Sequence, residues 1–335
     1  MKLLYQLSFA FLILTNCNTT KDIQEDSDRN ATVYAKTITL EELKENLYTL
    51  ASDAYEGRNT GEPGQKKAAA FLKQHYMSNG ISSAITPGDY YQEIPDYFLP
   101  DGIKPSENVV AYIKGSEFPE EIIVISAHYD HLGTKGDEIF NGADDDGSGT
   151  VAVLEIAEAF QLAADNADGP KRSILFLNLT AEEKGLYGSQ WYVENPLFPL
   201  ERHVANLNID MIGRVDDAHK NNRNYVYLIG SDKLSIELHK VSEQINDKYV
   251  HLNLDYTYND EDDPNRFYYR SDHYNFAKNN IPVIFYFNGV HADYHKSTDT
   301  AEKINYEMLT KRTKLVFHTA WEIANRQHKI TVDKK

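Results

Sequence analysis

The chain has 335 residues, of which 41% are hydrophobic and 12% aromatic, so it can bury a substantial core and does not belong to the disordered class. Its formal net charge is −17 at pH 7, from 51 acidic and 34 basic residues. A surface this acidic repels nucleic-acid backbones and anionic lipids, which excludes them as partners, and it favours cations and metal ions.

The N-terminus has the pattern of a targeting segment. A basic second residue precedes an apolar stretch over residues 3–14, which is too short for a permanent transmembrane helix. The next residues, LTNC, resemble a lipobox, except that Asn16 replaces the small residue usual before the cysteine. Cys17 is the only cysteine, so the chain can form no internal disulfide. We expect residues 1–17 to be a lipoprotein signal peptide with Cys17 acylated.

Residues 18–36 are polar and acidic without periodicity, and we expect them to form a flexible tether. Together these segments predict a protein of the cell envelope, on the periplasmic or the outer-membrane and surface side. Its only membrane contact would then be the lipid anchor. Without that anchor the protein would be secreted.

Two helices are predicted at the start of the folded region. Apolar residues recur at helical spacing over residues 40–50 behind Thr39, which is a suitable N-cap. A second apolar helical face runs over residues 68–76 and ends at Asn79-Gly80.

Strands and helices then alternate along the chain. Strands are predicted at 107–115, 121–128, 172–180, 203–213, 224–230 and 282–287, and helices at 148–163, 183–195, 232–248, 271–280 and 305–326. This alternation predicts a three-layer α/β/α sandwich around a mostly parallel mixed sheet. Because no Pro-, Gly- or Ser-rich linker interrupts it, we expect a single domain over residues 37–330.

Acidic and histidine side chains follow four of the predicted strands, at the point where each apolar run ends. Open α/β sheets bind ligands at the carboxyl ends of their strands. The residues concerned, in chain order, are His128, Asp130, Asp144, Asp145, Asp146, Glu182, Glu183, Asp210 and His295. If these strands are parallel neighbours, all of these side chains lie along one edge of the sheet.

So many carboxylates in one cleft repel each other strongly, and divalent cations remove that penalty. Mixed imidazole and carboxylate ligands suit zinc. Two ions about 3.5 to 4 Å apart need a bridging carboxylate, and an aspartate of the glycine-flanked turn at 142–149 is placed to reach both. The sequence therefore predicts a metal site at this edge.

Five motifs resemble, in this order, the signatures of metallopeptidase family 28. They are HYD at 128–130, GADDDGSG at 142–149, AEEKGLYGS at 181–189, NIDMIGR at 208–214 and YHKSTDT at 294–300. The stretch at 50–72 also resembles the leading helices of that family, so the resemblance covers nearly all of the mature chain. The connection from there to the HYD motif is too short for a protease-associated insert.

The resemblance implies two zinc ions per chain. It implies that His128 and Asp210 bind one zinc ion, that Glu183 and His295 bind the other, and that Asp145 bridges them. It favours Asp145 over Asp144 and Asp146 because the bridge lies three residues before the serine of the Ser-Gly pair.

The resemblance also implies roles for residues that do not bind metal. Glu182 would take a proton from the attacking water and return it to the departing amine. Tyr294 would donate a hydrogen bond to the oxyanion. Asp130 would hold the other ring nitrogen of His128, and Asp299 would be a supporting acid.

The function implied is that of an aminopeptidase, a zinc-dependent exopeptidase that removes N-terminal residues from peptide substrates. Carboxypeptidase activity, a glutaminyl cyclase-like reaction with one metal ion, and a non-catalytic binding lipoprotein are the alternatives on this scaffold. The complete set of five implied ligands favours two metals and hydrolysis, because decay to a binding protein normally removes ligands.

Two further segments have no assigned role. The acidic segment at 255–265 lacks the spacing of an EF-hand, and we interpret it as a solvated loop. The aromatic segment after it suggests that Tyr268, Tyr269 or Arg270 lines a substrate pocket. His273 and His291 are interpreted as structural or exposed.

Overall fold

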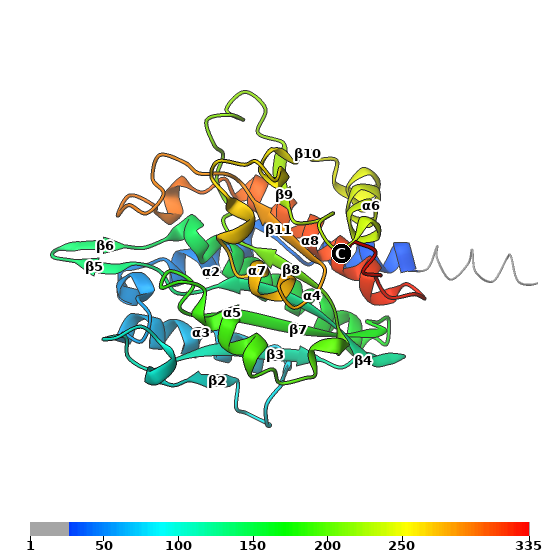
Figure 1. The fold of residues 1–335 in the computed structure, drawn as a ribbon, viewed down its shortest axis with the longest axis horizontal. Helices are drawn as coiled ribbons and strands as arrows, with labels where there is room; N and C mark the ends of the chain where they lie inside the picture. Colours follow the sequence, from blue (N-terminus) through cyan, green and yellow to red (C-terminus); the bar gives the residue numbers. More distant parts are fainter. Residues whose placement is uncertain (1–26, 335) are drawn as a thin grey trace, which may run out of the picture.

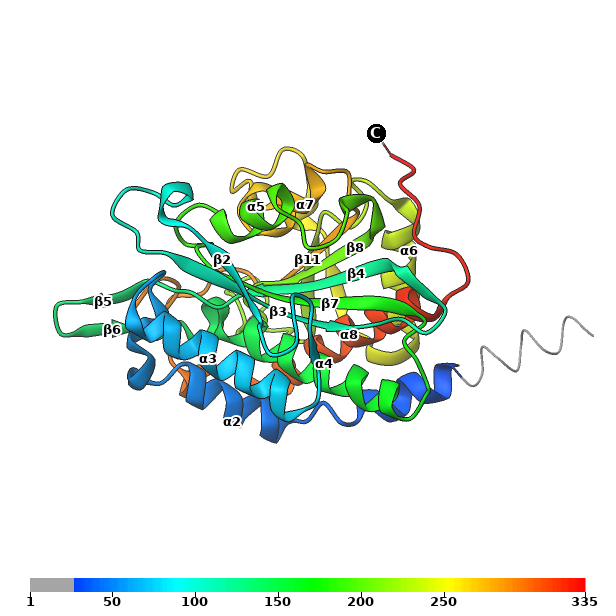
Figure 2. The ribbon, with the colours of Figure 1, turned by 90° about the horizontal axis from the view of Figure 1, so that it is seen from below.

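The computed structural model describes residues 27–334. Within them a nine-stranded mixed sheet crosses the molecule, with helices on both faces (Figures 1 and 2). Its strands are β1 (Ser82–Ser83), β2 (Tyr91–Ile94), β3 (Ser106–Ile113), β4 (Phe118–His128), β7 (Arg172–Leu179), β8 (His203–Ile209), β9 (Tyr225–Ile229), β10 (Asn253–Asp255) and β11 (Val283–Phe287). A separate hairpin consists of β5 (Gly133–Lys135) and β6 (Glu138–Phe140).

The strand order is β1-β3-β7-β4-β8-β11-β9-β10, and β2 pairs with β3. The four central strands β7, β4, β8 and β11 run parallel to one another. Antiparallel pairing is confined to the flanks, where β3 pairs with β1, β2 and β7, and β9 pairs with β11. The carboxyl ends of the four central strands therefore lie along one edge of the sheet, and the predicted α/β/α architecture is confirmed.

Helices α5 (Tyr187–Glu194) and α7 (His273–Ala277) cover one face of the sheet (Figure 2). The opposite face is covered by α2 (Leu40–Leu50), α3 (Pro63–Ser78), α4 (Gly149–Asp165), α6 (Ile236–Ile245) and α8 (Tyr306–Asn325). Three of these helices, α5, α6 and α7, are shorter than the periodicity predicts. In α6 the reason is local, since the Ser235 side chain accepts a hydrogen bond from the N–H of Leu238 and caps the helix there.

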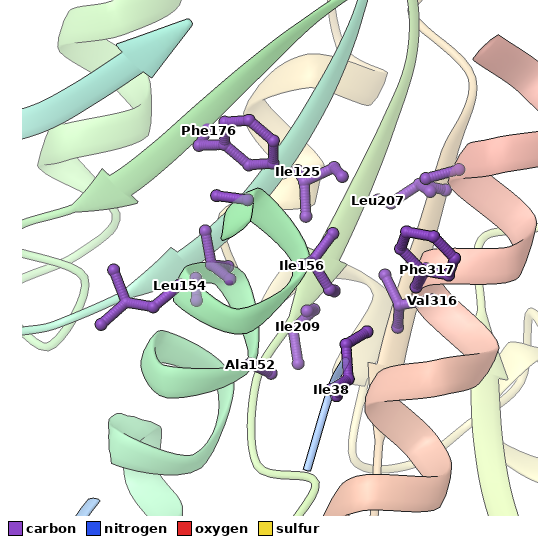
Figure 3. Close-up of a cluster of buried hydrophobic side chains, with 14 of the residues drawn as sticks. Ile38, Ile125, Ala152, Leu154, Ile156, Phe176, Leu207, Ile209, Val316 and Phe317 are labelled. Atoms are coloured by element: carbon purple, nitrogen blue, oxygen red, sulfur yellow. The ribbon is translucent and has the colours of Figure 1, made fainter. Parts of the chain in front are cut away.

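Successive residues of β4 pack on opposite faces of the sheet, as the two-residue period of a strand requires. Ile123 and Ile125 belong to the core beneath α4 and α8, which also contains Ile156 and Phe317 (Figure 3). Ile122 and Val124 belong to the core beneath α5 and α7. Because β4 is buried on both faces, the position of its last residue, His128, is fixed from both sides.

Residues 27–35 are helical rather than part of a flexible tether. Ala31, Tyr34 and Ala35 form an apolar stripe at helical spacing and are buried, and the Tyr34 ring stacks on that of Trp321 at 5.7 Å. The predicted signal peptide, with Cys17, and residues 18–26 of the predicted tether lie outside the described residues. No helix among residues 27–334 is long and apolar enough to cross a membrane.

Candidate functional site

Side chains that follow the four central strands converge at their carboxyl ends. His128 Nε2 lies 3.3 Å from Asp145 Oδ1 and 3.7 Å from Asp210 Oδ1. His295 Nε2 lies 3.0 Å from Asp145 Oδ2 and 3.3 Å from Glu183 Oε2. The structure thus brings together all five implied metal ligands, with one oxygen of Asp145 directed to each half of the cluster.

The three consecutive aspartates of the 142–149 turn have different partners. Asp144 Oδ1 accepts a hydrogen bond from the N–H of Gly213 at 2.6 Å, and its Oδ2 faces His291 Nε2 at 3.1 Å. Asp146 Oδ1 accepts from the N–H of Met211 at 3.0 Å and from that of Gly149 at 2.8 Å. Asp144 and Asp146 therefore tie the turn to the segment after β8, while Asp145 faces the histidines.

The turn that carries Asp145 is tightly wound. The Asp145-Asp146 peptide bond is cis, and Gly142 has φ +53°. A Cβ atom at Gly142 would lie 2.2 Å from the carbonyl oxygen of Asp145 and 2.5 Å from the His131 ring, so a side chain has no room there. Glycine is required at 142 because the carbonyl of Asp145 and the imidazole of His131 leave no space for a Cβ atom.

His131 also belongs to the cluster, and sequence reasoning missed it. Its Nδ1 lies 2.8 Å from Glu183 Oε1 and 3.8 Å from Asp145 Oδ2, and its side chain is fully buried. Neither ring nitrogen forms a hydrogen bond within the described part of the chain. The available signal was its place three residues after His128 in the same loop, where a second imidazole is able to reach the same site.

Supporting contacts hold the residues that follow β4 and β7. Nδ1 of His128 faces the main-chain oxygen of Asp130 at 3.1 Å, whereas the Asp130 carboxylate is 3.8 Å away. That carboxylate accepts hydrogen bonds from the N–H of Glu182 and from the Thr60 hydroxyl. The side-chain contact implied for Asp130 is thus replaced by a main-chain contact, and its carboxylate positions the loop that carries Glu182.

Polar atoms in this cluster are buried without hydrogen-bond partners among the described residues. They include Asp145 Oδ2, Asp146 Oδ2, Glu183 Oε1 and both ring nitrogens of His131. Two groups of potential ligands have their atoms within 4.8 Å of one another, namely His128, Asp146 and Asp210, and His131, Asp145 and Glu183. Burying such atoms without hydrogen bonds is costly, and imidazole with carboxylate is a donor set that zinc accepts, so the residues present fit zinc.

Glu182 lies beside the two groups, with Oε2 4.0 Å from His128 Nε2. Burial, reinforced by the neighbouring carboxylates of Glu183 and Asp210, raises the pKa of Glu182 well above its usual value. Burial also raises the pKa of Tyr294, whose ring stacks on that of His295 at 3.9 Å. The Tyr294 hydroxyl therefore stays protonated at neutral pH.

A pocket opens directly onto this cluster. Its apolar wall consists of Met211, Phe267, Phe285, Phe287 and Val290, and its polar side of His128, Asp145, Glu182, Asp210, Arg270, Tyr294 and His295. Of the three residues that the sequence suggested for a pocket wall, Arg270 lines this one. Tyr268 and Tyr269 line a separate surface cavity next to Asp260 and Asp262. The arrangement places a candidate metal centre, an acid–base carboxylate and a pocket with one apolar wall next to one another.

Residues 108–320 match the model of Peptidase family M28. Among curated proteins, Leupeptin-inactivating enzyme 1 of Streptomyces exfoliatus is 29% identical over 258 residues, which are 77% of this chain and 50% of that enzyme. The chain spans about half or less of the length of the curated relatives that it matches.

Solved structures share the fold. The LapA aminopeptidase of Legionella pneumophila superimposes with a TM-score of 0.69 and 24% identity, covering 90% of this chain and 76% of LapA. A zinc aminopeptidase from Bacillus subtilis gives a TM-score of 0.65 and 18% identity, covering 89% and 99%. At these identities the likeness establishes the architecture alone.

Proposed function

Because the chain belongs to peptidase family M28, we propose that it is a zinc-dependent aminopeptidase that hydrolyses N-terminal residues from peptides. The proposal depends above all on one observation, namely the set of buried imidazole and carboxylate atoms without hydrogen bonds around Asp145. A pocket with aromatic walls opens onto that set. This combination supports metal-assisted hydrolysis of a substrate whose side chain enters the pocket.

Two zinc ions would be held by the residues that converge on Asp145. One would be bound by His128, Asp145 and Asp210, and the other by Asp145, Glu183 and His295, with His131 within reach of the second. Bound zinc polarises a scissile carbonyl and increases the acidity of a water molecule. Ser271 supports the first group, since its hydroxyl donates to Asp210 Oδ2 at 2.7 Å and fixes that carboxylate.

Glu182 would be the general base of the reaction. In the proposed arrangement it accepts a proton from the attacking water on a carboxylate oxygen and delivers it to the departing amine. Its N–H donates to the Asp130 carboxylate at 3.2 Å, which holds the Glu182 main chain beside His128. A buried carboxylate with a raised pKa suits this role, because it binds a proton more readily than an exposed glutamate does.

Tyr294 would donate a hydrogen bond to the oxygen that becomes negative when the carbonyl is attacked. Its protonated hydroxyl is a donor at neutral pH, and stacking on His295 fixes the ring next to the cluster. Replacing Tyr294 by Phe keeps the stacked ring and removes the donor. We therefore assign Tyr294 to oxyanion stabilisation and the aromatic wall of the pocket to the substrate side chain.

The test compares Glu182→Gln with wild type, using an aminoacyl chromogen and a set of N-terminally free and N-terminally blocked peptides. We expect kcat to fall by about 10³-fold while zinc content and fold are unchanged. Glu194→Gln, on an exposed glutamate of α5, is the matched control and should behave as wild type. Cleavage of blocked peptides from the C-terminal end, cyclisation of N-terminal glutamine, or no turnover with two zinc ions bound would each contradict the proposal.

We also propose that the protein is attached to the cell envelope through acylated Cys17. The support is the apolar stretch at residues 3–14 followed by a lipobox-like LTNC. Cys17→Ser should move the protein from the membrane fraction to the soluble fraction and prevent incorporation of labelled fatty acid. Unchanged membrane association of the variant would contradict this assignment.

A further inference from the structure

Arg270 is the one arginine or lysine among the described residues that line the pocket. The other charged or ionisable groups there are the carboxylates Asp145, Glu182 and Asp210, together with the histidines and Tyr294. Arg270 is exposed, so its guanidinium is accessible to a molecule that enters the pocket. A permanent cation that lines this pocket without an ion pair to any of its three carboxylates needs an explanation.

The guanidinium of Arg270 has no partner of opposite charge among the described residues. It forms no ion pair or hydrogen bond with any other residue in the range 27–334, although its chain is rich in acids. It stacks on the ring of Phe267, whose centroid lies 5.0 Å from Cζ. Stacking on an aromatic ring orients the planar group and leaves its N–H donors available for a planar anion.

The backbone at Arg270 is fixed relative to the candidate metal centre. The N–H of Arg270 donates to the carbonyl oxygen of Phe267 at 3.0 Å, which closes the short helical turn that precedes it. The next residue, Ser271, is buried and donates its hydroxyl to Asp210. The main chain that carries Arg270 is therefore held one residue away from a contact with an implied metal ligand.

We propose that Arg270 is a specificity residue of this pocket and that it binds a carboxylate of the substrate. The proposal rests on the peptidase function proposed above and names its substrate class. A guanidinium binds a carboxylate through two parallel N–H donors, while the aromatic wall accommodates the methylene groups next to it. The carboxylate is supplied either by an acidic N-terminal residue or by the free C-terminus of a dipeptide. N-terminal lysine and arginine are disfavoured, because their cations face Arg270.

Three peptides separate these two sources. Leu-Ala amide carries no carboxylate, Glu-Ala amide carries one on its first side chain, and Leu-Ala carries one at its C-terminus. For wild type we expect kcat/KM to be higher for one of the two carboxylate-bearing peptides than for Leu-Ala amide, mainly through a lower KM. In Arg270→Gln the ratio between that peptide and Leu-Ala amide should fall about tenfold, as expected for loss of a charge-assisted bidentate pair.

Two further variants make the experiment specific. Arg270→Lys keeps the charge without the planar fork and should retain part of the preference. Arg266→Gln is the matched control, because Arg266 is an exposed cation four residues earlier that stacks on Tyr269 and lines the other cavity. It should leave the ratio as in wild type. A ratio that is the same in wild type and Arg270→Gln would overturn the inference.

Failure of the proposed function gives a different result from failure of this inference. If no peptide is hydrolysed, the peptidase proposal fails, and the role of Arg270 is then read from calorimetric binding of glutamate and leucine to the zinc-loaded protein. A preference for glutamate that is lost in Arg270→Gln supports the carboxylate site. If each amino acid binds Arg270→Gln as tightly as it binds wild type, the inference is overturned.

Discussion

Asp299 anchors the main chain of Asp145. Its Oδ2 accepts hydrogen bonds from the N–H of Asp145 at 3.2 Å and from that of Asp144 at 2.9 Å, and its side chain is fully buried. One carboxylate from the loop after β11 thus holds the turn that presents the implied bridge. Asp299 acts through the position of Asp145, and its other oxygen, Oδ1, lies 3.6 Å from Arg214 Nη1.

Removing this anchor should weaken metal binding. In Asp299→Ala we expect zinc affinity to fall by about 10- to 100-fold, because residues that orient ligands typically contribute that much. Asp299→Asn retains an acceptor oxygen and should lose less. The measurement is competition for zinc against a chromophoric chelator, with circular dichroism to monitor the fold. Asp137→Asn, in the exposed β5–β6 hairpin, is the control. Wild-type affinity in Asp299→Ala would show that the turn holds its shape without the anchor.

His131 should contribute to one of the two metal positions. Its buried Nδ1 faces Glu183 and Asp145, so it either donates a nitrogen to the ion or orients Glu183. In His131→Ala we expect one of two bound ions to be lost on dialysis against a zinc buffer. The cobalt-substituted protein should show a changed visible spectrum. His328→Ala, on an exposed histidine near the C-terminus, should keep both ions. Two tightly bound ions and an unchanged cobalt spectrum in His131→Ala would rule out this role.

The architecture was predictable because its strongest signals are local. Apolar runs of five to eight residues mark the four central strands, and acidic residues mark their carboxyl ends, so the edge that carries His128 and Asp210 follows from the pattern alone. The short strands β1, β2, β5, β6 and β10 were missed, since runs of two to four residues without periodicity resemble loops. The helix at 27–35 was missed because its polar composition hides a stripe of only three buried residues.

Contacts between distant segments could not be predicted in the same way. The roles of Asp144 and Asp146 depend on the segment 211–213 that follows β8, about 65 residues later in the chain. Nothing in the spacing of the motif reveals which main-chain N–H groups each carboxylate meets. The same holds for Arg58, whose neighbours in sequence suggest an exposed turn although its side chain is fully buried.

Arg58 links two loops of the candidate site. Its guanidinium donates to the main-chain oxygens of Tyr129 at 2.8 Å, Asn141 at 2.6 Å, Gly142 at 2.8 Å and Leu50 at 3.2 Å. Tyr129 follows His128, and Gly142 opens the aspartate turn. The buried Arg58 side chain therefore holds together the segment after β4 and the aspartate turn, which both carry residues of the cluster.

Replacing Arg58 by Met should destabilise the fold and loosen the metal site together. Several buried carbonyl groups would lose their partner, at a cost of roughly 1–3 kcal/mol each, so we expect the free energy of unfolding to fall by at least about 3 kcal/mol. Arg58→Lys can satisfy some of them and should be intermediate. The readout is the unfolding temperature with and without zinc. The control is Arg266→Met, which removes an exposed arginine. If Arg58→Met and Arg266→Met unfold at the same temperature, the prediction is wrong.

Glu155 should make the stability of the protein depend on pH. It lies in α4 and is 3% exposed, and its Oε1 accepts a hydrogen bond from Asn46 at 3.0 Å. Burial, followed by repulsion from Glu42 and Glu158, raises the pKa of Glu155 from 4.5 to about 8. The folded state therefore binds a proton in this pH range that the unfolded state has released. Stability falls as pH rises between these two values.

Glu155→Gln removes the ionisation and keeps the acceptor for Asn46. At pH 8 we expect the variant to unfold about 3 °C above wild type, and near pH 5, where wild type is protonated in the folded state, the difference should shrink towards zero. Taking the difference between variant and wild type at each pH cancels the effect of pH on metal binding, which both proteins share. Glu41→Gln, on the exposed face of α2, should show no such trend. A constant difference at both pH values, or a larger one at pH 5, would show that Glu155 is ionised in the folded protein.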